Sequence, residues 1–203
     1  ITSLEFENIE FQHASNNKYF MNADKSFTLE SVSFVNCDFI GLTRGFWRHQ
    51  QATSKHIMNF EVEGCRFDKC GWQTGSYGLV DLRSFNDPTS YDQIDKAVFR
   101  NCTFSRDNDG TAGFGWGNLF YAPYVDKPIQ LEFKNITIYN YSLNKRLINI
   151  SSAVGSELTI EGMVLASPSG DLYVAGANTT THFSNNYTTK DLSLIHISEP
   201  TRL

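Results

Sequence analysis

The chain repeats one short pattern of apolar and polar positions. Each copy has two apolar residues separated by one other residue, a spacer, an Asn or Gly, and then two more apolar residues, as in Val32-Ser-Phe34-Val-Asn36-Cys37-Asp-Phe39. Alternation with a period of two is typical of a β-strand that buries one face. Because the phase slips by one residue at the Asn or Gly, each copy predicts a strand, a one-residue corner and a second strand. The copies centre on Asn8, Asn36, Gly64, Asn101, Asn135 and Gly162.

Asn and Gly suit such corners because both tolerate left-handed backbone angles. Stacked corners would also place equivalent amides about 4.8 Å apart, close enough for a hydrogen-bonded ladder at the edge of the interior. Gly64 and Gly162 should interrupt that ladder. Its expected members are Asn8, Asn36, Asn101 and Asn135. Asn101 and Asn135 also open N-x-S/T sequons, but we expect their amides to point inward and interpret them as structural.

The spacing of the corners predicts the fold. Successive corners are 28, 28, 37, 34 and 27 residues apart, which is within the range of solenoid repeats. We therefore expect an all-β, right-handed parallel β-helix of about six coils, each with a third strand. The candidate third strands are 19–22, 46–50, 79–83, 119–123, 147–151 and 172–176. An α/β fold would need helical periods that the chain lacks, and a β-sandwich would not explain the fixed phase slip.

Length, charge and the two ends refine this prediction. The chain has 203 residues and a net charge of −5, so it has enough residues for one core and no basic surface for nucleic acid. No run of eighteen apolar residues predicts a transmembrane segment. Residues 192–202 look like a translated sequencing adapter, and a genuine strand is the alternative. We expect a β-helix domain over 1–191, truncated at both ends, and a non-native tail over 192–203.

The cysteines predict a packed interior. Cys37, Cys65 and Cys102 follow the corner in three consecutive copies, so we expect them to stack in the core as small apolar side chains. Cys65 and Cys70 are five residues apart, but no further Cys or His group completes a zinc site. A disulfide between stacked neighbours is the open alternative, because adjacent coils approach the required distance.

Two long insertions, at about 84–95 and 105–117, border the third strand and predict a cleft on its outer face. If alternate residues point outward, Trp47 and His49 point inward. The central outward column is then Met21, Arg48, Asp81, Tyr121, Asn149 and Val174. The neighbouring column is Ala23, Gln50, Arg83, Pro123 and Ser151.

The chemistry of this cleft suits a sugar. The polar residues that the coil rise would bring within about 10 Å of one another are Arg48, Asp81, Arg83 and Tyr121. The aromatic residues expected to wall the groove are Trp72, Phe114 and Trp116. Flat aromatic faces beside charged groups favour binding of a sugar ring or a uronate chain. The alternative is an ordinary cross-strand ladder in which Arg48 pairs with Asp81, Tyr121 covers them and nothing binds.

Catalysis is less well supported by the residues. Glycoside hydrolysis usually needs two carboxylates, and the column supplies only Asp81. A polysaccharide lyase needs a base near the C5 proton of a uronate and a cation on its carboxylate, which Arg83 or Tyr121 and Arg48 could supply. Calcium could replace the arginine, but the Asp-Asn-Asp-Gly stretch at 107–110 lacks the distal Glu of a calcium loop and favours a solvated turn. We therefore expect no cofactor and no metal.

The recurring F-x-N-C-x-F phrase, with Leu79-Val-Asp81-Leu-Arg83 on the strand between copies, resembles a family of bacterial surface β-helix proteins of unknown function. These proteins are encoded in polysaccharide-utilisation gene clusters and resemble the pectate-lyase-like superfamily in fold. The resemblance covers about residues 1–191 and implies an extracellular or outer-membrane protein with a polysaccharide or oligosaccharide partner. The catalytic signatures of polygalacturonases and pectate lyases are missing. We therefore expect a glycan-binding or scaffolding β-helix, with a polysaccharide lyase and an adhesin or spike-like structural protein as the alternatives.

Overall fold

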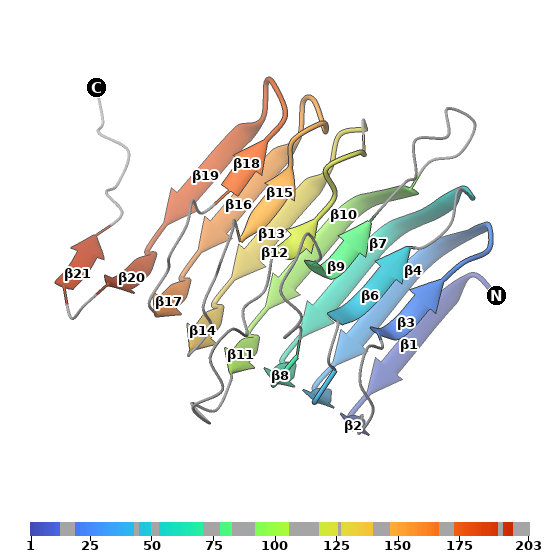
Figure 1. Ribbon diagram of the computed structural model, residues 1–203, viewed down its shortest axis with the longest axis horizontal. Coiled ribbons are helices and arrows are strands. Elements are labelled where there is room, and N and C mark those ends of the chain that lie inside the picture. Colours follow the sequence, from blue (N-terminus) through green and yellow to red (C-terminus); the bar gives the residue numbers. More distant parts are fainter. Residues whose placement is uncertain are drawn as a thin grey trace.

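The computed structural model describes these parts of the chain: residues 1–12, 19–42, 45–49, 53–70, 78–82, 92–105, 118–125, 127–139, 147–166, 173–190 and 193–196. All regular structure within them is β-strand. The strands form three sheets, A, B and C, and each of the first six coils gives one strand to each sheet. The coils lie side by side along the long axis of the molecule (Figure 1). This architecture is a parallel β-helix, as the repeats predict.

The three sheets differ in strand length. Sheet A contains β1 (Ser3–Glu7), β4 (Phe27–Val35), β7 (Lys55–Glu63), β10 (Asp92–Arg100), β13 (Gln130–Lys134), β16 (Glu157–Glu161) and β19 (Thr180–Ser184). Sheet B contains β2 (Glu10–Gln12), β5 (Asp38–Ile40), β8 (Arg66–Asp68), β11 (Thr103–Ser105), β14 (Thr137–Tyr139), β17 (Val164–Ala166), β20 (Tyr187–Lys190) and β21 (Ser193–His196). Sheet C contains β3 (Tyr19–Ala23), β6 (Gly45–His49), β9 (Gly78–Leu82), β12 (Asn118–Tyr121), β15 (Ile148–Ile150) and β18 (Tyr173–Ala175). Neighbouring strands are parallel except for β20 and β21, which pair antiparallel.

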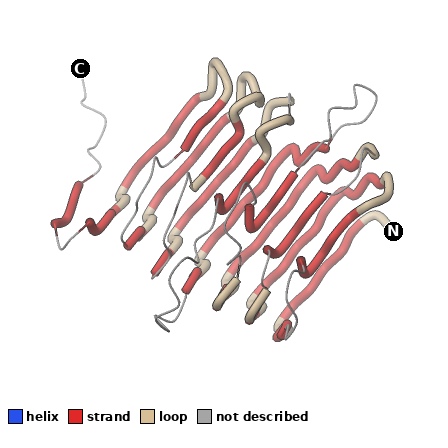
Figure 2. Tube along the Cα trace, in the orientation of Figure 1, coloured by secondary structure: helices blue, strands red, loops and turns tan. Residues whose placement is uncertain are grey.

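The corners between sheets A and B have the predicted backbone. The Asn and Gly at the six predicted corners all have positive φ, from 52° at Asn36 to 65° at Gly162. In Figure 2 these corners are the short loops that join the long strands of sheet A to the short strands of sheet B. The left-handed conformation turns the chain within one residue, which is why the apolar pattern shifts phase there.

The orientation of the corner amides corrects the sequence prediction. Asn8, Asn36, Asn101 and Asn135 are exposed, not turned inward. A single residue between two inward neighbours has to face outward, so the ladder forms on the outer surface of the corner. Asn135 Nδ2 donates to Asn101 Oδ1 at 3.1 Å, but no side-chain hydrogen bond joins Asn8 to Asn36 in the described structure. Among the described residues, the ladder therefore has one such hydrogen bond, between Asn135 and Asn101.

Stacked aromatic side chains fill the interior. Phe6 and Phe34 stack with their ring centroids 4.8 Å apart, and Phe39 and Phe67 repeat this spacing one sheet away. That distance matches the separation of neighbouring strands, because equivalent residues of successive coils lie directly above one another. Full burial of one such side chain contributes about 1.5–3 kcal/mol to stability. The in-register packing therefore fixes both the coil pitch and the face that each strand buries.

The structure contains a seventh coil that the repeat count missed. Asn185 has a φ of 54° and follows Gly162 as the next corner, between β19 and β20. Thr181 lies opposite Leu158 of the preceding coil, so a polar residue occupies a position where that coil has a leucine. The slot after the corner holds Asn186, whose Oδ1 accepts from the Met163 amide at 2.9 Å. Polar residues at inward positions hide this copy from a search based on hydrophobicity.

Candidate functional site

Sheet C brings together three of the residues predicted for the cleft. Arg48 in β6 lies opposite Asp81 in β9, and Asp81 lies opposite Tyr121 in β12. Asn149 and Val174 continue the column in β15 and β18. The predicted alignment therefore holds over five coils.

The alignment fails in the first coil. Met21 lies opposite Trp47, and Asn22 is the residue opposite Arg48. The prediction assumed strict alternation, but Phe46 and Trp47 are consecutive and both buried in the core. The pairing of β3 with β6 keeps one register from Tyr19 to Ala23, so Met21 falls opposite the buried Trp47 and packs against the core.

Tyr19 is the residue of this cluster that sequence reasoning missed. Its hydroxyl donates to Asp81 Oδ2 at 3.2 Å, and the Arg48 guanidinium lies 5.4 Å from the centre of its ring. The ring crosses β6 at Gly45, where a β-carbon would come within 2.6 Å of it. A glycine at the start of a third strand was the signal that a neighbouring aromatic side chain packs over the backbone.

The cluster is buried, so it does not form an exposed binding surface. Arg48 is 8% exposed and Asp81 is fully buried, as are Trp47 and His49, which were expected to point inward. Arg48 and Asp81 therefore do not line an open groove in the described structure, and their catalytic roles stay predictions. The other predicted site residues lie outside the described residues: Arg83, Trp72, Phe114, Trp116 and the 107–110 stretch.

The cysteines are packed in the core. Cys37, Cys65 and Cys102 are buried in consecutive coils, and the Cys37 amide donates to Cys65 Sγ at 3.4 Å. All are free thiols, so the disulfide alternative is wrong. Burial raises the pKa of Cys65 and of Cys102 to about 12. Thiols with such pKa values are neutral near pH 7, which makes them poor nucleophiles and poor metal ligands.

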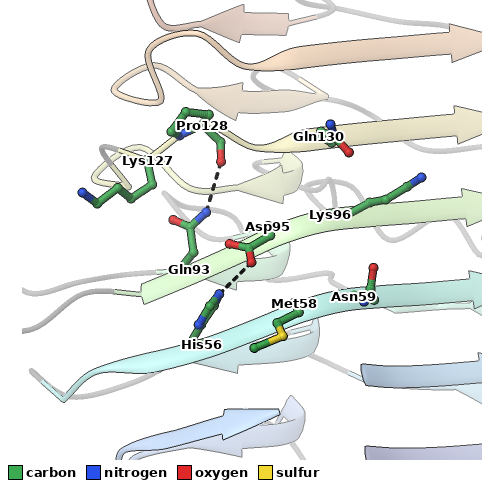
Figure 3. A pocket seen from close by; sticks show the side chains of 9 residues that line it. All are labelled: His56, Met58, Asn59, Gln93, Asp95, Lys96, Lys127, Pro128 and Gln130. Carbon is green, nitrogen blue, oxygen red and sulfur yellow. Dashed lines mark hydrogen bonds and ion pairs between the residues drawn. The ribbon is translucent and has the colours of Figure 1, made fainter. Parts of the chain in front are cut away.

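An open groove of about 730 Å³ lies instead on the outer face of sheet A (Figure 3). It crosses β7, β10 and the segment that leads into β13. Its lining residues are His56, Met58, Asn59, Gln93, Asp95, Lys96, Lys127, Pro128 and Gln130. This groove was not predicted, and we call it the sheet A groove.

A bend in the sheet places the groove. In β7 the residues Met58 and Asn59 are both exposed, between the buried residues Ile57 and Phe60. The pairing of β7 with β10 passes from Ile57 to Asn59, and Met58 has no partner in the register. Two consecutive outward residues bend a strand as a bulge does. The pairing of β4 with β7 omits the same position, and in β10 the omitted residue is Asp95. The bend therefore runs across three coils.

Two side chains at the bend are held by defined contacts. His56 Nε2 and Asp95 Oδ2 are 2.9 Å apart and connect β7 to β10 (Figure 3). Gln93 is only 4% exposed, and its Nε2 donates to the Pro128 carbonyl at 3.1 Å. These contacts connect the three coils and fix the floor of the groove.

A charge network borders the groove. Lys96 Nζ lies 3.1 Å from Glu132 Oε1, and Arg100 contacts both Glu132 and Glu61. Burial alone would raise the pKa of Glu132, but the hydrogen bond and charge of Lys96, with Lys134 and Arg100, outweigh it and hold that pKa below its usual value. The charges on this side of the groove are thus already neutralised by their neighbours.

No family model, curated protein or solved structure matches this chain. A function for the sheet A groove therefore rests on the chemistry of its lining residues. In the described residues no group of three or more His, Cys, Asp or Glu side chains lies together to hold a metal ion. The same part of the chain holds no helix with the length and hydrophobicity needed to span a membrane.

The sequence did contain a signal for the groove. Three consecutive coils place two non-core residues between apolar ones, as in Ile57-Met-Asn-Phe60 and Ile94-Asp-Lys-Ala97. Strict alternation of inward and outward residues would allow only one residue between the two apolar ones. A doublet at the same place in neighbouring coils predicts a bend, and a bend on an outer face creates a concave surface.

Proposed function

We propose that this β-helix binds a glycan chain in the sheet A groove, as part of an extracellular or surface protein engaged in polysaccharide use. The observation that carries the proposal is the open groove of about 730 Å³, which combines amide, ammonium and imidazole groups with the apolar surfaces of Met58 and Pro128. Sugars present hydroxyls that donate and accept hydrogen bonds, and C–H faces that pack on apolar atoms. The groove offers a partner for each.

The scaffold supports binding because it holds the groove in shape. The floor consists of three neighbouring coils whose strands pair in register. The hydrogen bond from Gln93 to Pro128 and the pair of His56 with Asp95 cross from coil to coil. A preorganised surface loses little conformational entropy when a ligand binds.

The other hypotheses have less support in the described residues. A lyase that used Arg48 and Asp81 would need groups that the fold already engages, because the Tyr19 hydroxyl donates to Asp81 and the Arg48 guanidinium lies over the Tyr19 ring. The hypothesis of an adhesin or spike-like structural protein gives the sheet A groove no role. The resemblance to surface β-helix proteins of polysaccharide-utilisation clusters agrees with the binding proposal, and a polysaccharide lyase remains the alternative.

A glycan array probed with the full chain tests this proposal. Glycans that the array retains are then titrated by calorimetry against the wild type and two variants. Gln130→Ala removes an exposed amide from the groove, and Gln12→Ala removes an exposed amide from sheet B. We expect Gln130→Ala to weaken binding by about threefold to tenfold, since one hydrogen bond contributes about 0.5–1.5 kcal/mol. We expect Gln12→Ala to bind like the wild type. An array that retains no glycan, or equal effects of the two variants, contradicts the proposal.

A further inference from the structure

One end of the sheet A groove has two functional groups that are not paired with any of the described residues. They are the ammonium of Lys127 and the amide oxygen of Gln93, and both residues line the groove beside Pro128. Lys127 is exposed and lies in the segment that leads into β13. Lys96, the other lysine of the groove, is paired with Glu132. Among the described residues that line the groove, Lys127 is the lysine without an ion pair.

Gln93 adds an independent observation. Gln93 is 4% exposed, and its Oε1 has no hydrogen-bond partner in the part of the chain that the structure describes. The orientation of the amide is fixed, because Nε2 donates to the carbonyls of Ile94 and Pro128 at 3.3 and 3.1 Å. A flipped amide would set its oxygen against both carbonyls. In Figure 3 the nitrogen faces Pro128 and the oxygen turns to the side of the groove where Lys127 lies. A buried acceptor without a donor is unfavourable, so a donor supplied by a ligand would be bound preferentially.

We propose that Lys127 and Gln93 form a subsite for an acidic sugar unit, in which Lys127 pairs with the anionic group and Gln93 Oε1 accepts a hydrogen bond from a hydroxyl. This inference rests on the proposed function and names the class of glycan. The anionic group is a carboxylate or a sulfate, since a lysine ammonium is a point charge that selects for charge more than for shape. The exposed Lys127 side chain can turn toward a ligand that enters the groove.

Calorimetry with three tetrasaccharides of one sugar series tests the subsite. The probes are tetragalacturonate, its carboxyl-reduced neutral form, and a sulfated galactose tetramer. We expect at least one acidic probe to bind about tenfold more tightly than the neutral probe, with a preference that declines as NaCl is added. The tighter of the two acidic probes identifies carboxylate or sulfate as the anion.

Four variants separate the contributions. Lys127→Gln should abolish the preference for acidic probes, and Lys127→Arg should retain it. Lys25→Gln, at an exposed lysine in the turn between β3 and β4, should leave all affinities unchanged. Gln93→Met keeps a similar volume and removes both the acceptor and the Nε2 donor to Pro128, so it should weaken the acidic and neutral probes by the same factor. Urea unfolding of this variant shows whether the fold persists without the donor.

The outcomes distinguish this inference from the proposed function. If the array retains glycans but acidic and neutral probes bind alike, or Lys127→Gln behaves like Lys25→Gln, the acidic subsite is wrong and glycan binding stands. If the array retains only neutral glycans, the subsite is equally overturned. If no glycan binds the full chain, both proposals fail.

Discussion

At the scale of single residues, a buried contact between Tyr19 and Asp81 connects coils that are not neighbours. Tyr19 is in β3 and Asp81 is in β9, with β6 between them. The Tyr19 ring passes over β6 at Gly45, where a β-carbon would come within 2.6 Å of it. The hydroxyl therefore reaches the carboxylate only because the intervening residue is a glycine.

The Tyr19 hydroxyl should stabilise the fold through the buried Asp81. Tyr19→Phe removes the donor 3.2 Å from Asp81 Oδ2 and leaves a buried carboxylate with one hydrogen bond fewer. We expect the free energy of unfolding in urea to fall by about 1–3 kcal/mol. Tyr124→Phe, at a tyrosine that is 55% exposed, is the control and should change it by less than about 0.5 kcal/mol. Equal effects would mean that the hydrogen bond contributes nothing.

His49 should make stability depend on pH. Burial, with a smaller contribution from the charge of Lys55, lowers its pKa from 6.5 to about 3. As pH falls below 6.5 the unfolded chain binds a proton at His49 while the folded chain does not, so stability is lost in that range and is unaffected above it. The loss should be about 1.4 kcal/mol per pH unit.

Urea unfolding at pH 7.5 and pH 5.0 measures this dependence. The wild type should lose about 2 kcal/mol between the two values, since roughly 1.5 pH units lie below the unfolded pKa. His49→Leu should remove that loss, although it lowers stability at both pH values. His182→Leu, at an exposed histidine, should keep it. A wild-type stability that is flat over this range would show that His49 titrates normally in the fold.

At the scale of the elements, strands with a clear apolar pattern were predicted to within one or two residues. The third strand of the fourth coil was expected at 119–123 and is β12 at Asn118–Tyr121. The bend in sheet A was not predicted because Met58 and Asn59 precede the repeated pattern, whose copy around Gly64 begins at Phe60. The groove follows from pairs of consecutive outward residues, which a search for strict alternation discards.

The corner between β7 and β8 should be sensitive to a single methyl group. At Gly64 φ is 62°, and a β-carbon would lie 2.4 Å from Asn36 Oδ1 in the coil below. Gly155 has a similar φ of 75° but no atom within 4 Å of that position. Gly155→Ala should therefore cost only the backbone strain of about 1–2 kcal/mol, and Gly64→Ala should cost roughly 1 kcal/mol more in denaturant unfolding. Equal losses would show that Asn36 moves aside freely.

At the scale of the whole molecule, the fold was predictable because the same interaction recurs. Each coil repeats the strand, corner and strand pattern, and errors in one coil do not alter the next. The coil count was low because the seventh copy has Thr181 and Asn186 at inward positions. The site was harder to predict than the fold, since it depends on where the repeat departs from regularity.

The repeat should allow one coil to be removed. Deletion of residues 136–162 joins Asn135 to Met163, which occupies the same slot as Ile136, and makes β13 and β19 neighbours in register. A solenoid in which coils contact only adjacent coils should fold after such a deletion. We expect cooperative unfolding with a β-rich circular dichroism spectrum. The dependence of unfolding free energy on urea should fall by roughly one seventh, because one of seven sheet A strands and its buried surface are lost. Deletion of 136–149 removes about half a coil, joins the corner Asn135 to Ile150 at the end of β15 and should unfold the chain. If the full-coil deletion also unfolds, the coils depend on contacts beyond their nearest neighbours.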